Sequence, residues 1–175
     1  MSSLSTQIVT PHTLDLKSIK GIIENLLYLS PNRHLLYATD TNRGVPTRNL
    51  EHLSCFLPGV LVLGTHTLDM SLSDRELHEW AARGLAYTCY LTYADQPSGL
   101  GPDIMVMDAW SGEGTGRWID HVNDWIEAGR PGDVPPGLHE PPPVKDGSGK
   151  DYRISRGDYL LRPEVSKGII MSSSS

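Results

Sequence analysis

Three short segments hold the side chains of this sequence that could do acid–base chemistry or bind a ligand. They are Glu51–Gly59 (EHLSCFLPG), Tyr87–Tyr90 (YTCY) and Tyr159–Glu164 (YLLRPE). A carboxylate or an imidazole can donate or accept a proton, and a guanidinium offers fixed donors to hydroxyls or carboxylates. Elsewhere the seven histidines lack metal-ligand spacing, and the sequence has no HExxH pair, phosphate-binding glycine loop or nucleophile elbow.

Each of these side chains also has an ordinary structural explanation. The Arg-Pro-Glu run at 162–164 suits a helix start, with proline in the first turn and glutamate near the positive end of the helix dipole. Arg162 could form a surface salt bridge, and His52 could be a polar residue near a helix start. Cys55 and Cys89 could be two buried thiols. No one of these motifs is decisive alone.

Helices are expected on both sides of the first segment. Apolar residues recur at helical spacing from Leu16 to Leu27, and Pro31 closes this predicted helix. Pro58 fits the first turn of a second helix at Leu57–Thr65, with Glu51 and His52 just before it.

A longer helix should carry the second segment. Ser73–Glu76 (SDRE) predicts a capping box, in which the serine and glutamate side chains satisfy free backbone donors. The apolar spacing that follows puts Cys89 on the side of the core leucines, and Gly84 is a weak point unless another backbone packs closely there. The other predicted elements are strands at 34–39, 104–107 and 151–155, a turn at 40–44, a helix at 118–128 and a loop at 129–149.

Taken together and in this order, the three segments resemble the class I α-1,2-mannosidases, glycoside hydrolase family 47. Members of this family carry a D/E-H-L-x-C-F-L-P-G segment, a second cysteine in a TCY context and an L-L-R-P-E segment. Ser98–Asp103 (SGLGPD) is also similar to the family's T-G-L-x-P-E segment, with Asp103 where a glutamate is usual. The resemblance covers about residues 16–164, within one expected domain over 1–175, and corresponds to a middle portion of a family catalytic domain.

The resemblance implies a mainly α fold, a partial (α/α)7 barrel with short β-hairpins in its connecting loops. It also implies inverting hydrolysis of terminal α-1,2-linked mannose in N-glycan processing, so the expected partner is a high-mannose N-glycan. Inversion needs a general acid and a general base, separated widely enough to admit a water molecule. Glu164 matches the family residue assigned as the base, and Arg162, His52 and Asp103 match substrate-binding positions.

The resemblance further implies a Cys55–Cys89 disulfide, which could stabilise the fold by roughly 3–4 kcal/mol. A disulfide favours the secretory pathway (endoplasmic reticulum or Golgi) or secretion, although the first residues do not read as a signal peptide. No run of about 18 apolar residues predicts a transmembrane segment. The net charge of −6 and the pI near 5.6 argue against a nucleic-acid partner.

The sequence departs from the family at its C-terminal side. Lys167 stands at the place of a second family glutamate, and a cation there should lower the pKa of the presumed base. Calcium is implied by the family, but its ligand segment is absent here, so no metal ligand is assigned. We therefore expect this chain to be inactive alone and to associate through exposed apolar helix faces. The residues at 111–149 form a loop-rich insert, and 172–175 a disordered tail.

Two alternatives to a glycosidase stay open. A degenerate, lectin-like module could hold mannose through His52, Arg162 and Glu164 without cleaving it. A truncated product would have no independent function. Affinity for a mannose disaccharide without turnover favours the first alternative, and the lack of both properties favours the second.

Overall fold

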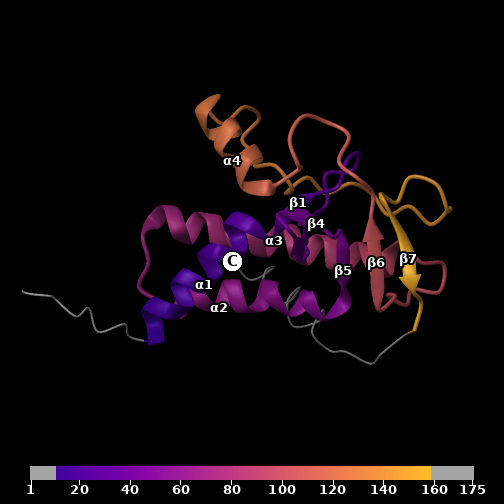
Figure 1. Cartoon of the computed structure of the whole chain (residues 1–175), viewed down its shortest axis with the longest axis horizontal. Coiled ribbons are helices and arrows are strands. Elements are labelled where there is room, and N and C mark those ends of the chain that lie inside the picture. Colours follow the sequence, from indigo (N-terminus) through magenta and orange to yellow (C-terminus); the bar gives the residue numbers. More distant parts are fainter. Residues whose placement is uncertain (1–10, 159–175) are drawn as a thin grey trace, which may run out of the picture.

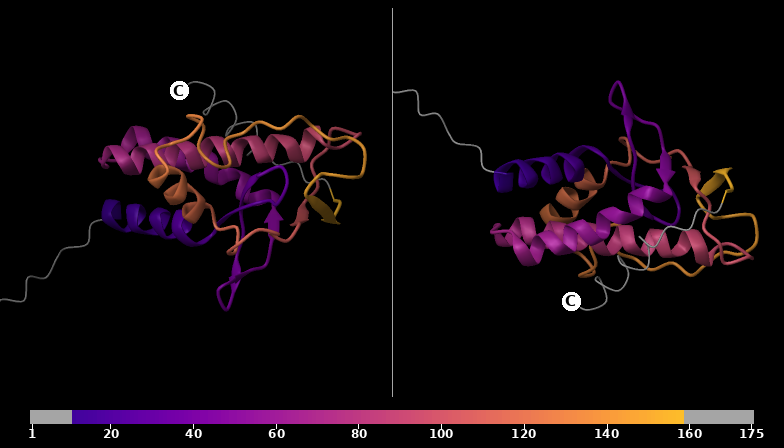
Figure 2. Two further views of the ribbon diagram at one scale, coloured as in Figure 1. Left: turned by 90° about the horizontal axis from the view of Figure 1, so that it is seen from above. Right: turned by 90° about the horizontal axis from the view of Figure 1, so that it is seen from below.

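Four α-helices form most of the regular secondary structure in the described chain, residues 11–158, of the computed structural model (Figure 1). α2 (Leu57–Thr67) and α3 (Leu72–Ala94) form a helical hairpin. α1 (Pro11–Asn25) and α4 (Trp118–Glu127) contact each other on one side of that hairpin (Figure 2). The predicted mainly helical fold is confirmed for this part of the chain.

Three small antiparallel sheets connect and flank the helices. The first two are hairpins, and the third has the strand order β5-β6-β7. Their strands are β1 (Leu27–Leu29) with β2 (Leu36–Ala38), β3 (Thr41–Asn42) with β4 (Val45–Pro46), and β5 (Asn49–Glu51), β6 (Ile104–Met107) and β7 (Tyr152–Arg156).

A 3-10 helix, η1 (His52–Phe56), carries the chain from β5 into α2. A disulfide between Cys55 in η1 and Cys89 in α3 joins the two elements, with Cα atoms 5.9 Å apart. Both cysteines are buried. The predicted pairing is confirmed, and it holds the end of β5 against the long helix.

The main core lies between the four helices and the β1–β2 hairpin. Trp118 and Val122 of α4 are fully buried there, and the Trp118 indole N–H donates to the carbonyl of Pro136 at 2.7 Å. α4 therefore belongs to the core, although it lies within the loop-rich insert.

The first helix ends earlier than its apolar spacing predicts. α1 stops at Asn25, and Leu27 instead begins β1, where it pairs with Ala38. Leu27 and Leu29 are buried in this hairpin. Apolar spacing alone could not decide whether Leu27 belongs to the helix or to a strand, because a buried strand and the inner face of a helix both consist of apolar residues.

The predicted capping box at Ser73–Glu76 is wrong. α3 begins at Leu72, and the N-cap is Ser71, whose hydroxyl accepts a hydrogen bond from the Asp74 backbone N–H at 3.1 Å. Two serines, at 71 and 73, each have an acidic residue three positions later, so the local pattern fits both. Glu76 instead forms an ion pair with Arg130, at 2.9 Å.

The predicted turn at 40–44 is shorter in the structure, where residues 41–42 form β3 and only 43–44 make the turn into β4. The other predicted elements are confirmed with small shifts in their ends. α2 begins at Leu57 with Pro58 in its first turn, and the predicted strands and helix at 34–39, 104–107, 118–128 and 151–155 correspond to β2, β6, α4 and β7. Residues 129–149 contain neither a helix nor a strand. The glycine at position 84 inside α3 is also explained. The backbone of Gly137 packs so closely there that a Cβ atom would lie 2.8 Å from its carbonyl oxygen.

The described elements do not close a barrel, so only the helical class of the predicted fold is established. The predicted disordered tail at 172–175 lies outside the described residues. Within residues 11–158, no helix has the length and apolar character needed to cross a membrane.

Candidate functional site

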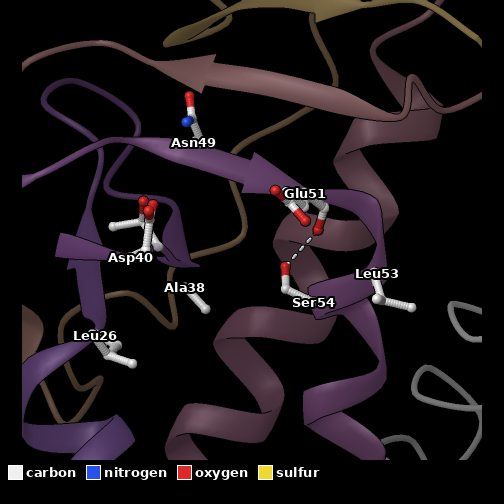
Figure 3. Close-up of a pocket in the computed structure, with 8 residues that line it drawn as sticks. Leu26, Ala38, Asp40, Asn49, Glu51, Leu53 and Ser54 are labelled. Atoms are coloured by element: carbon white, nitrogen blue, oxygen red, sulfur yellow. Dashed lines mark hydrogen bonds between the residues drawn. The ribbon is translucent and has the colours of Figure 1, made fainter. Parts of the chain in front are cut away.

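A cavity of about 450 Å³ opens where β5 ends and η1 begins (Figure 3). Glu51 and Asp40 are its two acidic residues, and both are exposed. In Figure 3 they stand on either side of the opening, Asp40 beside the β2–β3 corner and Glu51 at the end of β5. The other lining residues are polar or small and apolar: Leu26, Ala38, Thr39, Asn49, Leu53 and Ser54.

Strand geometry places Glu51 at this opening. Successive side chains of a strand point to opposite faces, and Leu50 is buried, so Glu51 faces the other way. β5 is held by β6, with Glu51 opposite Ile104. The Ser54 hydroxyl donates to the Glu51 carbonyl at 2.6 Å, which fixes the turn into η1 and leaves the carboxylate available.

His52 is buried behind this opening. Its Nε2 lies 2.5 Å from the Tyr93 hydroxyl, and the two rings meet edge-on with centroids 5.4 Å apart. The described residues that line the cavity do not include His52. Its backbone N–H donates to the Asp103 carbonyl at 2.8 Å, so the structure brings these two predicted site residues together through the backbone.

Asp103 connects η1 to the last strand. Its side chain is 7 % exposed, its backbone N–H donates to the Arg156 carbonyl at 3.1 Å, and its carboxylate lies 3.6 Å from the Arg156 guanidinium. Arg156 also pairs with Asp158 at 2.9 Å. The predicted site residues Glu164 and Arg162, and Lys167 beside them, lie outside the described residues.

The three-stranded sheet aligns the ends of β5 and β7. Glu51 pairs with Ile104, and Ile104 pairs with Arg156, so these residues form one row across the sheet. Because both neighbours of β6 run antiparallel to it, β5 and β7 run in the same direction. The last residue of β7, Arg156, therefore lies at the same end of the sheet as Glu51, and the chain leaves the sheet there.

A buried polar cluster, the Asp95–Asp151 cluster, anchors β7. Arg33 pairs with Asp95 at 2.7 Å, with side chains 8 % and 0 % exposed. Asp95 also accepts from the Tyr152 hydroxyl at 3.1 Å and from the Val144 backbone N–H at 2.7 Å. These bonds hold the start of β7 and the 129–149 loop on the end of α3.

Asp151, the residue just before β7, also belongs to this cluster. Its carboxylate accepts four hydrogen bonds from the β1–β2 turn, at 2.6–2.8 Å, from the Ser30 hydroxyl, the Asn32 side chain and the backbone N–H groups of Asn32 and Arg33. Burial raises the pKa of this carboxyl, but the hydrogen bonds to its charged form outweigh burial, so its pKa is lowered overall.

The sequence interpretation missed Glu51 and Asp40 as site residues. Glu51 lies inside the E-H-L-x-C segment, and the alternation around buried Leu50 could have shown that it faces away from the core. Asp40 reads only as a turn residue, and no local signal places it across a cavity from Glu51.

The model of glycosyl hydrolase family 47 matches residues 11–171 of the chain. The chain belongs to this family. It is 31% identical over 124 residues to the endoplasmic reticulum mannosyl-oligosaccharide 1,2-alpha-mannosidase of Saccharomyces cerevisiae, over 63% of this chain and 23% of that protein. It is 36% identical over 88 residues to the protein of the same name from Mus musculus, over 50% of this chain and 13% of that protein.

A solved structure supports the fold of this family 47 chain. The alpha-1,2-mannosidase from Trichoderma reesei aligns with a TM-score of 0.56 and 18% identity, over 89% of this chain and 27% of that one. The chain thus spans about a quarter or less of these relatives. At this identity the structural likeness bears on the fold alone.

Proposed function

We propose that this chain forms part of a glycosidase site for α-1,2-linked mannose, in which Glu51 faces the sugar and Glu164 is the general base. The observation that carries the proposal is the exposed Glu51 carboxylate in the cavity, beside the point where the chain leaves β7. The names of the curated relatives supply the substrate, an α-1,2-mannosyl oligosaccharide, and the location, the endoplasmic reticulum.

The lining of the cavity suits a neutral, polyhydroxylated ligand. Carboxylates, an amide and hydroxyls can bond to sugar hydroxyls, while Leu26, Ala38 and Leu53 offer apolar surface. A volume of about 450 Å³ is enough for a small ligand.

Sheet geometry supports a second carboxylate close to Glu51. Arg156 lies two strands away, about 10 Å at ordinary strand spacing. The eight residues from Gly157 to Glu164 can span up to about 27 Å. This reach is long enough for Glu164 to return to the cavity.

The other proposed site residues act around these two carboxylates. Arg162 lies two residues before Glu164 and would offer guanidinium donors to sugar hydroxyls. His52 and Asp103 stay proposed substrate-binding residues. Their backbone bond and the bonds of Asp103 to Arg156 support this, because they join the end of β5 to the end of β7.

Calcium prefers six to eight oxygen ligands. Residues 11–158 contain no group of three or more histidine, cysteine, aspartate or glutamate side chains that could hold a metal ion. The described residues therefore do not fit the calcium site that the family resemblance implies, and no step is assigned to the ion here.

Titration with α-1,2-mannobiose tests this function. We expect saturable binding to the chain, weakened at least about tenfold by Glu51→Gln, because the exposed carboxylate then loses its charge-assisted hydrogen bonds. Glu79→Gln, which neutralises an exposed carboxylate on α3, is the matched control. Unchanged affinity in Glu51→Gln would contradict the proposed site.

Mannose release in the same samples separates hydrolysis from binding. Turnover abolished by Glu164→Gln would assign the base and would show that the chain alone is active. Binding without turnover favours the lectin-like alternative for this chain alone.

We also propose that the chain associates through an apolar surface of η1 and α2. Phe56 is 56 % exposed and Leu63 52 %, so both side chains leave apolar area in water. Sedimentation velocity at increasing protein concentration measures this, and Phe56→Ser with Leu63→Ser should shift the chain to monomer.

A further inference from the structure

A second cavity, of about 250 Å³, lies beside α4. Its walls come from β1 and the turn that follows it, from α4, and from the segments on either side of α4. It shares no lining residue with the cavity around Glu51. Three imidazoles, from His34, His121 and His139, and two indoles, from Trp110 and Trp125, supply most of its functional groups.

Both indole rings are fixed by their surroundings. The Trp110 N–H donates to the Glu113 carbonyl at 3.0 Å, and the Trp125 N–H donates to the Pro131 carbonyl at 2.9 Å. Trp125 also meets Trp80 edge-on, with centroids 5.6 Å apart. Because both N–H groups are already bonded, the rings offer a ligand mainly their aromatic surface.

Two glycines make room for Trp110. A Cβ atom at Gly116 would lie 2.9 Å from the indole, and one at Gly112 would lie 3.0 Å from it, so the ring packs directly against backbone. His121 meets Trp110 edge-on at a centroid distance of 4.8 Å, and His34 lies at 5.8 Å. His34 has a φ of 53°, a left-handed conformation that costs free energy in a residue other than glycine.

The cavity is lined without charged side chains. Lysine, arginine, aspartate and glutamate are all missing from its described lining, although the Arg130 guanidinium lies 5.6 Å from the centroid of the Trp125 ring. Burial lowers the pKa of His121, which keeps this imidazole neutral near pH 7, with one donor and one acceptor nitrogen. The described imidazoles also do not gather into a group that could hold a metal ion.

We propose that this cavity binds one pyranose ring of a neutral oligosaccharide, with an apolar face of the sugar on Trp110 and its hydroxyls bonded to His34, His121 and His139. A pyranose combines a C–H-rich face with several hydroxyls, and this cavity combines a flat aromatic ring with imidazole nitrogens that can bond to hydroxyls. No carboxylate lines it, so the sugar would be held and not cleaved. The inference goes beyond the proposed function and rests on this cavity alone.

Titration of the ¹⁵N-labelled chain with α-1,2-mannobiose and with methyl α-mannopyranoside tests the proposal. The four tryptophan indole N–H signals report separately on this cavity and on the core. We expect saturable shifts of the Trp110 and Trp125 signals at up to about 50 mM sugar, with millimolar affinity. The signal of the fully buried Trp118 shows whether each variant is folded. It does not serve as an unshifted reference, because its N–H donates to the carbonyl of Pro136, which lines the cavity.

Variants then decide whether these shifts come from this cavity. Trp110→Ala should weaken the binding about tenfold, since it removes the aromatic contact. His139→Ala, which truncates an exposed side chain, should weaken it severalfold and serves if Trp110→Ala fails to fold. Tyr90→Ala removes a 42 % exposed ring outside the lining of this cavity, so it should leave the affinity read from the Trp110 signal unchanged.

The proposal is overturned if neither sugar gives a saturable shift of the Trp110 signal. It is also overturned if the affinity is unchanged both in His139→Ala and in folded Trp110→Ala. A third contrary result is a proline decapeptide that binds to this cavity in preference to the sugars. Loss of the Trp110 shift in Glu51→Gln would also count against it, because the two cavities would then be one site. Failure of the Glu51 site by itself leaves the Trp110 shift in place, so the two proposals fail separately.

Discussion

Asp95→Ala should cost this chain a large part of its folding free energy. The substitution removes the partner of Arg33 inside the Asp95–Asp151 cluster, where the two side chains are 8 % and 0 % exposed. Breaking a buried ion pair from one side costs about 3–5 kcal/mol, because the other charge stays buried without compensation. The Val144 backbone N–H loses its acceptor as well.

Urea unfolding followed by circular dichroism measures this loss. Small domains have about 5–15 kcal/mol of total stability, so the variant should unfold at a much lower urea concentration. Asp120→Ala is the matched control, because it breaks the Arg117–Asp120 pair, whose side chains are 40 % and 48 % exposed. An exposed pair contributes only about 0–1 kcal/mol.

The double variant Arg33→Met with Asp95→Leu separates a lost partner from lost packing. Apolar residues of similar size often replace a buried ion pair with little net cost, so this variant should recover much of the stability lost in Asp95→Ala. If Asp95→Ala and Asp120→Ala lose the same stability within about 1 kcal/mol, the cluster does not anchor β7 as argued.

Four further perturbations follow from the same structure. Replacing both Cys55 and Cys89 by alanine should lower the unfolding free energy by about 4 kcal/mol from the loss of a 34-residue constraint, measured by urea unfolding, and a reducing agent should change the wild type but not the variant. Gly84→Ala should cost about 1–3 kcal/mol in thermal unfolding, because its Cβ atom would lie 2.8 Å from a carbonyl oxygen of the facing loop. Gly21→Ala, where a Cβ atom meets nothing within 4 Å, should stabilise α1 by about 0.5–1 kcal/mol. The lowered pKa of Asp151 contributes stability that is present above its ordinary value of 3.8 and lost as the pH falls through the lower folded value. Asp151→Asn, which tolerates the local φ of 64°, should therefore be less stable at pH 6 and lose less further stability between pH 5 and pH 2.

Local signals predicted the elements that depend on local chemistry. Pro58 marked the start of α2, and the apolar run at 104–107 became β6. Local signals failed where the same residues fit two different elements or two different caps. Leu27 fits the helix spacing but pairs with Ala38 in a sheet, and Ser71 replaces Ser73 as the N-cap of α3. Tertiary pairing decides such cases, and apolar spacing does not record it.

Of the candidate site, only the E-H-L-x-C segment could be predicted from the sequence. The E-H-L-x-C segment pointed to His52 and the disulfide, but Glu51 gains its position from pairing with Ile104, which lies more than fifty residues away in the sequence. The buried pair of Arg33 and Asp95 is equally non-local. Glycines 112 and 116 looked like loop residues, although they seat Trp110 against the backbone. The pairings of Glu51 and of Arg33 need contacts that no short stretch of sequence contains. The packing of Trp110 is local in sequence, but a glycine-rich stretch does not show which side chain its glycines face.

The 129–149 loop runs from the wall of the second cavity to the Asp95–Asp151 cluster. On one side it supplies His139 and Pro131 to the wall beside α4. On the other side, the backbone N–H of Val144 in this loop donates to the Asp95 carboxylate at 2.7 Å. Lys150, which follows the loop, donates to the Asp95 carbonyl at 2.7 Å. The same cluster holds the start of β7, and β7 sets where the chain emerges beside Glu51. Asp95→Ala should therefore disturb the start of β7 and the end of this loop together, because both are bonded to the same buried carboxylate.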